Sequence, residues 1–140
     1  MPRWLTYALL SMLFAGVTSV IAKLGLGGIS ADLGLALRTC FVFACVLMFA
    51  AVTVPHAELN ALTSRNLYWL ALSGLTAAIS WIFYYRAIKL GEVSKVALID
   101  KGSVVVALAL SVFVLNEVLT PAKLLGAALM IAGLVVISHG

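Results

Sequence analysis

Residues 93–115 read VSKVALIDKGSVVVALALSVFVL, and this segment restricts how the chain can fold. Its apolar second half, residues 104–115, is shorter than the ~20 helical residues that cross the ~30 Å hydrocarbon core of a bilayer. A spanning helix must therefore also include residues before Asp100. The segment predicts a transmembrane helix that carries Asp100 and Lys101 one or two turns inside its boundary.

The composition of the whole chain indicates that lipid is its solvent. Of its 140 residues, 64% are apolar and 10% are charged, whereas soluble domains carry about 25% charged residues. The net charge is +4, but the basic residues stand singly near the expected helix ends. Such residues suit anchoring at anionic headgroups, and the lack of a basic stripe with interleaved aromatic residues argues against nucleic-acid binding.

Five apolar segments are each close to the length of a membrane span: residues 4–23, 33–54, 66–88, 93–115 and 121–138. Because lipid offers no hydrogen bonds, their backbones must pair internally, which selects helices over open strands. The first segment is too long for a signal-peptide core and is interpreted as a retained helix. The sequence thus predicts an all-α, polytopic membrane protein, with a single domain of residues 1–140 forming a five-helix bundle.

Local signals mark the ends of these helices and their orientation. Asp32 and Ser64 are expected to be the N-caps of the second and third helices, and Thr120 that of the fifth, with Pro121 at its first position. An odd number of helices places the termini on opposite sides of the membrane. Basic residues are commoner on the side of the third connection, residues 86–95, which favours a cytoplasmic location for it and an N-terminus on the outside. The excess is small enough to permit insertion in both orientations.

Asp100 and Lys101 are the unusual pair of the chain. Ionisable groups inside a span are costly and usually face a bundle interior or a wet cavity. Adjacent residues do not face each other on a helix, so each is expected to find a partner on another helix. A gate or coupling site is one interpretation; a lysine reaching the interface and an acid at the polar end of a helix is the other. Gly102 could loosen the helix at this point.

Stripes of small and polar residues follow three of the helices at spacings of three and four. They could line a polar cavity, or they could promote close helix packing while their hydroxyls bond their own backbone. The aromatic residues that close the third helix could line the same site, although an interfacial belt is the simpler role for them. The candidate lining or gating residues are Ser80, Trp81, Tyr84, Asp100, Lys101 and Ser103.

Other features have modest interpretations. The fifth helix carries small residues that let a neighbouring helix approach, either as a dimer face or within the bundle: Ala122, Gly126, Ala128, Ala132 and Gly133. Glu117 is interpreted as an interfacial acid beside a cap. Cys40 and Cys45 are expected to be buried, inert thiols, and their separation of about 140° on a helix prevents a shared metal. No catalytic constellation or phosphate loop occurs, so neither an enzyme nor a cofactor or metal is expected.

Several motifs together resemble a known family. The sequence WIFYYRAIKLG at residues 81–91, residues 94–100, LNE at residues 115–117 and LGAALMIAG at residues 125–133 are similar to the EamA domain of the drug/metabolite transporter superfamily, here its short five-helix bacterial and archaeal branch. The resemblance covers essentially the whole chain. Two departures are Asn116, where the family usually has glycine, and Gly102, near a position often held by proline.

The resemblance implies a transporter in the cell membrane. Most members have ten helices in two oppositely oriented five-helix repeats and move small metabolites. A single repeat is expected to pair with a second copy, which can be inverted. The site is expected between the first, third and fourth helices of both copies. The expected partners are the lipid bilayer, a small polar organic substrate and a second copy of the chain. Alternatives are a small-multidrug-resistance-like cation exporter, although the first helix has no acid, and an accessory subunit of a membrane complex or lipid-carrier flippase.

Overall fold

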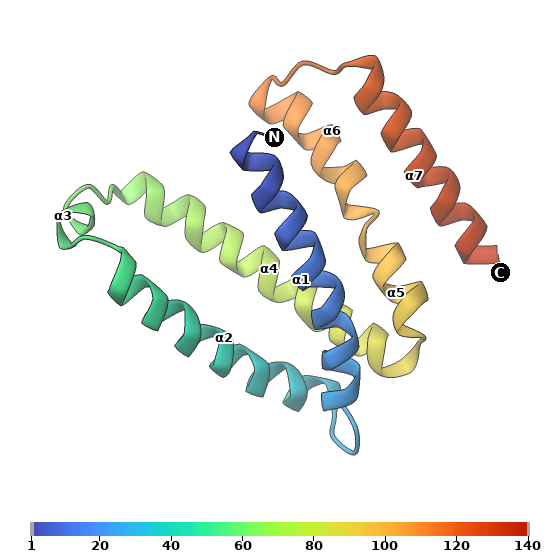
Figure 1. Ribbon diagram of the computed structural model, residues 1–140, viewed down its shortest axis with the longest axis horizontal. Coiled ribbons are helices and arrows are strands. Elements are labelled where there is room, and N and C mark those ends of the chain that lie inside the picture. The colour runs from blue at the N-terminus through green and yellow to red at the C-terminus, as the bar shows by residue number, and fades with distance from the viewer. Residues whose placement is uncertain (1, 140) are drawn as a thin grey trace. The chain divides into compact units, whose positions relative to one another are not determined.

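The computed structural model describes residues 2–139, and its regular elements are helices. Their bounds are α1 (Arg3–Gly25), α2 (Ala31–Thr53), α3 (His56–Leu59), α4 (Ser64–Leu90), α5 (Val93–Asp100), α6 (Ser103–Leu115) and α7 (Pro121–His139), as Figure 1 shows. Within residues 2–139, five segments are long and apolar enough to cross a membrane, and α5 and α6 together form the fourth. The prediction of an all-α protein with five spans is therefore confirmed.

The helix N-termini show which polar residue acts as the cap. The Ser30 hydroxyl accepts a hydrogen bond from the Leu33 N–H at 3.2 Å, so Ser30 and not Asp32 caps α2. The Thr63 hydroxyl accepts from the Asn66 N–H at 3.2 Å, one residue before the expected Ser64. Both expectations were wrong because the cap must lie outside the helix and reach the third N–H, whereas Asp32 and Ser64 are already helical.

The start of α7 agrees with the sequence prediction, and the connection after α2 contains a helix that was not predicted. Thr120 accepts from the Lys123 N–H at 3.3 Å and Pro121 is the first residue of α7, as the sequence predicted. After α2, the backbone of Val54 is extended, as is usual before a proline. The short helix α3 follows Pro55 and was not predicted, because one turn carries too few residues to show a helical period.

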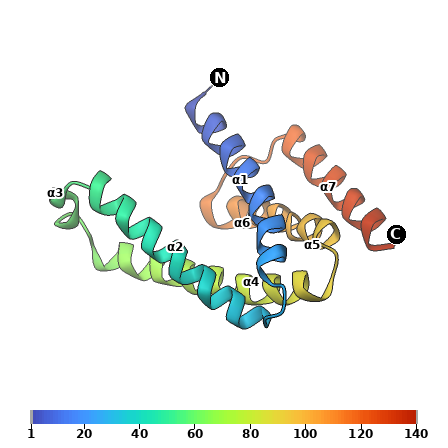
Figure 2. The ribbon, with the colours of Figure 1, turned by 60° about the horizontal axis from the view of Figure 1, so that its bottom comes forward.

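The chain divides into two units, each described here by itself. The hairpin unit comprises residues 22–90, and the terminal unit comprises residues 1–21 and 91–140. In the hairpin unit, α2 packs along α4, and Figures 1 and 2 show the two helices side by side. In the terminal unit, α7 lies beside both α5 and α6. The connection from α2 to α4, residues 54–63, is short, which makes α2 and α4 antiparallel neighbours.

Little of the apolar surface is covered by the chain itself. Among residues 2–139, the buried apolar side chains are Leu26, Tyr85 and Ile88, all in the hairpin unit. Leucine, valine and phenylalanine side chains along every span are exposed, and Cys40 and Cys45, expected to be buried, are exposed as well. Apolar faces of this extent need lipid or another protein against them.

Candidate functional site

The fourth span is broken where the sequence places its charged pair. Helix α5 ends at Asp100 and α6 begins at Ser103. Backbone N–H groups around the break donate three residues back instead of four: Lys101 to Leu98 at 3.1 Å, Gly102 to Ile99 at 2.9 Å and Val104 to Lys101 at 3.1 Å. This tight, 3₁₀-like turn joins two half-helices and is the form that a functional hinge within a helix often takes.

Gly102 lies where there is little room for a side chain. A Cβ atom at this position would lie 2.9 Å from Leu134 Cδ1 on α7 and 3.0 Å from the Ile99 carbonyl oxygen. Its backbone has φ −58°, which any residue adopts, so lack of space and not backbone conformation selects glycine. The break lies at Gly102, and the prediction that this glycine loosens the helix stays a prediction.

Asp100 and Lys101 face each other across the end of α5. Asp100 Oδ2 lies 3.8 Å from Lys101 Nζ, and their side chains are 38% and 52% exposed. The expectation that these neighbours would point apart was wrong, because it assumed a continuous helix and α5 ends between them. At 3.8 Å the charges attract but make no hydrogen bond, so the pair is loosely held. Ser103, the first residue of α6, is exposed.

An aromatic group closes α4 in the hairpin unit. Trp81 and Tyr84 are half-buried, and Tyr85 is 4% exposed, one of the best-covered side chains of the described residues. The rings of Tyr84 and Tyr85 meet edge to face with centroids 6.5 Å apart. Ser80, the other residue predicted for this helix, is exposed.

Arg38 of α2 joins this aromatic group, and the sequence analysis did not select it. Its guanidinium carbon lies 4.7 Å from the Trp81 ring centroid and 5.7 Å from that of Tyr85, both within cation–π range. Arg38 is half-buried and stands two turns inside an apolar span. The same reasoning that singled out Asp100, an ionisable group inside a span, would have found it.

Below the aromatic group, charged side chains close the end of the hairpin unit. Arg86 donates through Nε and Nη2 to both carboxylate oxygens of Asp32, at 3.0 and 3.2 Å. Lys89, in the last turn of α4, donates to the Leu26 carbonyl just after α1 at 2.7 Å. Lys23, in the last turn of α1, donates in return to the Ile88 carbonyl. Each lysine thus binds carbonyls at the C-terminal end of the other helix, where cations are favoured.

The polar stripes use part of their hydroxyls on their own helices. Thr76 donates to the Ser73 carbonyl at 2.9 Å, Ser111 to the Leu108 carbonyl at 3.0 Å, and Thr18 to the Phe14 carbonyl at 2.7 Å. These bonds satisfy the hydroxyl donors locally. The predicted site residues fall into two groups, with Ser80, Trp81 and Tyr84 in the hairpin unit and Asp100, Lys101 and Ser103 in the terminal unit.

The small residues of α7 lie on two faces. Ala122, Gly126 and Gly133 fall within about 40° of one another, and Ala128 and Ala132 lie on another side, at 100° per residue. All five are exposed, and a Cβ atom on Gly126 or Gly133 would meet nothing within 4 Å. The half-buried residues of α7 are others: Ala127, Met130, Leu134 and Ile137.

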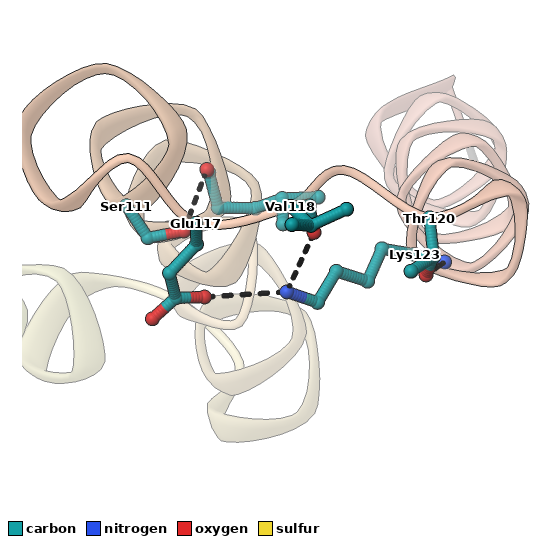
Figure 3. Close-up of polar contacts among 6 residues, drawn as sticks. Ser111, Glu117, Val118, Thr120 and Lys123 are labelled. Carbon is teal, nitrogen blue, oxygen red and sulfur yellow. Dashed lines mark hydrogen bonds and ion pairs between the residues drawn. The ribbon is translucent and has the colours of Figure 1, made fainter.

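The connection between α6 and α7 is tied by one lysine. Asn116 ends α6 in the left-handed region with φ 54°, a conformation that asparagine tolerates. The Glu117 N–H donates to the Ser111 carbonyl at 3.2 Å. Lys123 Nζ reaches back to Glu117 Oε2 at 3.2 Å and to the Val118 carbonyl at 3.1 Å, as Figure 3 shows. Glu117 is therefore half of an ion pair beside the caps of α6 and α7.

Comparison with known proteins agrees with this description. The model of the EamA-like transporter family matches residues 2–139. A protein of Sinorhizobium sp. described as an uncharacterized transporter in the cobO 3′ region is 37% identical over 130 residues, which are 93% of this chain and 92% of that protein. No solved structure matches the chain.

These comparisons agree with the five candidate spans. They confirm the resemblance drawn from residues 81–133 and the expectation of a multi-pass membrane transporter. The family is one of transporters and not of enzymes. The chain belongs to the EamA-like transporter family.

Proposed function

We propose that the chain is half of a secondary transporter for a small polar organic metabolite and works as a pair of five-helix copies. The observation that carries this proposal is the loosely held Asp100–Lys101 pair at the break between α5 and α6. Discontinuous helices are the elements with which many secondary transporters bind substrates and coupling ions. The candidate lining or gating residues are Asp100, Lys101 and Ser103 at the break, and Ser80, Trp81 and Tyr84 in the hairpin unit.

The break offers two parts of a gating step. Its backbone is joined by bonds that reach three residues back, whose geometry is poorer than that of α-helical bonds and which often mark a hinge. Its two charges are close enough to attract but are not bonded, so either can exchange its neighbour for a polar substrate or an ion at small cost. Packing of Leu134 against Gly102 couples such a movement to α7.

Pairing of two copies is supported by the exposed surface. The matched family unit spans nearly the whole chain. On α7, a Cβ atom at Gly126 or Gly133 would meet open space, so the surface there is free for another helix. Small residues at such positions let the helix of a second copy approach closely. The weak bias of basic residues between the two sides is compatible with an inverted second copy.

Transport by Asp100→Asn tests the role of the break. The purified protein in liposomes is assayed for counterflow of a panel of labelled amino acids and small organic acids, with the parent and the variant compared at equal reconstitution. Loss of the carboxylate charge should lower flux by about tenfold or more, the value of one charge-assisted interaction, while membrane insertion stays normal. Glu58→Gln, an exposed acid on α3, is the matched control. Normal flux in Asp100→Asn would remove Asp100 from the mechanism.

A further inference from the structure

The Arg38 guanidinium has unused hydrogen-bond donors inside a membrane span. It is placed seven residues after the first residue of α2, about 10 Å along the helix axis. Its described contacts are the rings of Trp81 and Tyr85, and within residues 2–139 it makes no hydrogen bond or ion pair. A ring face attracts the cation but accepts none of its five N–H groups. Those donors need an acceptor that the described chain does not supply.

The nearest acid on the same helix is already engaged. Asp32 receives both of its described bonds from Arg86, in the two-pronged geometry typical of arginine and carboxylate. The hairpin unit therefore pairs one arginine with a carboxylate and leaves a second arginine, deeper in the span, without one. An isolated guanidinium in a span is costly, and a carboxylate or phosphate from outside the chain would match its planar fork.

The surroundings hold Arg38 in place. Trp81 and Tyr85 are one turn apart on α4, and Tyr85 and Ile88 are 4% and 0% exposed. The Leu26 side chain packs over Gly34, one turn before Arg38 on α2, where any Cβ atom would collide with it. The guanidinium is thus supported by the best-packed part of the described chain, and a ligand would meet a cation that is already oriented.

We propose that Arg38, stacked on Trp81 and Tyr85, is an anion-binding residue that recognises the carboxylate or phosphate group of the transported metabolite. This proposal rests on the proposed function, because it takes the bound anion to be part of a transported metabolite. It restricts the substrate class to organic acids, amino acids and phosphate esters. The same chemistry could also be supplied by a lipid headgroup phosphate, because an arginine about 10 Å inside a span can extend toward the interface. The test separates these two sources.

The test reads binding directly. The full chain carrying Trp4→Phe and Trp69→Phe, so that fluorescence reports Trp81, is purified in an uncharged maltoside detergent. It is titrated to roughly 10 mM, above the KM values typical of metabolite sites, with acetate, alanine, inorganic phosphate and glycerol 3-phosphate. Acetamide, alaninamide and glycerol are the matched compounds without the acidic group. We expect a saturable change with at least one acid and none with its matched compound.

Variants assign that change to Arg38. Arg38→Gln should weaken binding by about tenfold or more, the value of a charge-assisted hydrogen bond, and Arg38→Lys should retain part of it. Arg65→Gln, at the other end of α4, is the control and should bind as the parent does. Because Arg38→Gln could fail to fold, labelling of the parent protein with phenylglyoxal is mapped by mass spectrometry. The anion should protect Arg38 and leave Arg65 reactive.

Each outcome decides the proposal. A response to phosphatidylglycerol in mixed detergent micelles, with none to any of the four soluble acids, would assign Arg38 to lipid and overturn its role in substrate binding. No saturable response to any anion, or equal binding by Arg38→Gln, would overturn the anion site. Counterflow distinguishes failure of the anion site from failure of the proposed function. Flux of a compound without an acidic group that is unchanged in Arg38→Gln would support transport and refute the anion site. Anion binding at Arg38 without flux of any compound would support the anion site and count against transport.

Discussion

Two groups of charges, one in each unit of the chain, are held in opposite ways. In the hairpin unit, Arg86 binds Asp32 at 3.0 and 3.2 Å, and Lys89 binds a backbone carbonyl at 2.7 Å. In the terminal unit, Asp100 and Lys101 are 3.8 Å apart at a broken helix. The first arrangement satisfies its donors at fixed positions, and the second leaves both charges ready to change neighbours. The comparison indicates a scaffold at one place and an adjustable element at the other.

The largest expected effect comes from removing the support of the scaffold. Tyr85→Ala deletes a ring that is 4% exposed and contacts Arg38. Truncation of a buried aromatic residue typically costs about 3–5 kcal/mol, so the thermal unfolding temperature of the purified protein should fall strongly. Phe83→Ala, on the same helix with a ring that is 66% exposed, is the control and should change little. Equal effects of the two would mean that the scaffold is no more rigid than the surface.

A pair of glycine substitutions tests the break by comparison with an open position. Gly102→Ala brings a Cβ atom to 2.9 Å from Leu134 and 3.0 Å from the Ile99 carbonyl, whereas a Cβ atom at Gly74 on α4 meets nothing within 4 Å. Overpacking costs about 1–3 kcal/mol, and alanine at an open helical glycine adds up to about 1 kcal/mol of stability. Thermal unfolding should therefore move down for Gly102→Ala and up for Gly74→Ala. A stabilised Gly102→Ala would contradict the described packing at the break.

The smallest effect is expected at the exposed ion pair. Asp32→Asn removes the carboxylate charge that Arg86 binds, but both side chains are more than half exposed, and exposed ion pairs contribute little. The unfolding temperature should fall slightly at low salt, and the difference from the parent should shrink at high salt because screening weakens the pair in the parent. A large, salt-independent loss would show that the pair is covered by lipid or by a second copy.

Much of the fold could be predicted from the chain because membrane spans are recorded in local sequence. The length of each apolar segment predicted the five spans. The fourth was expected as one helix over residues 93–115 that Gly102 could loosen, and the break between α5 and α6 was not predicted. Capping residues were harder, since Ser30 and Asp32 are both suitable and the backbone decides which one lies outside the helix. The facing of Asp100 and Lys101 was mispredicted for a related reason, because it depends on where α5 ends.

The aromatic setting of Arg38 could not be read from the sequence in the same way. Its ring partners Trp81 and Tyr85 lie on a different helix, more than forty positions later. Only the packing of α2 along α4 brings them together. Local periodicity identifies which face of a helix is apolar but not which neighbour covers it, and so a contact between helices remained outside the prediction.

The reciprocal lysine bonds of the hairpin unit have a consequence for how the protein is made. While the chain enters the membrane, the positive charges of Lys23 and Lys89 bias its orientation. In the folded protein the same ammonium groups bind the carbonyls of Ile88 and Leu26. The same two lysines therefore first influence the orientation of the chain and then bond the end of one helix to the end of another. Orientation and helix contact cannot be altered independently at these two positions. A mutation that removes either positive charge also removes a hydrogen bond between the end of α1 and the end of α4.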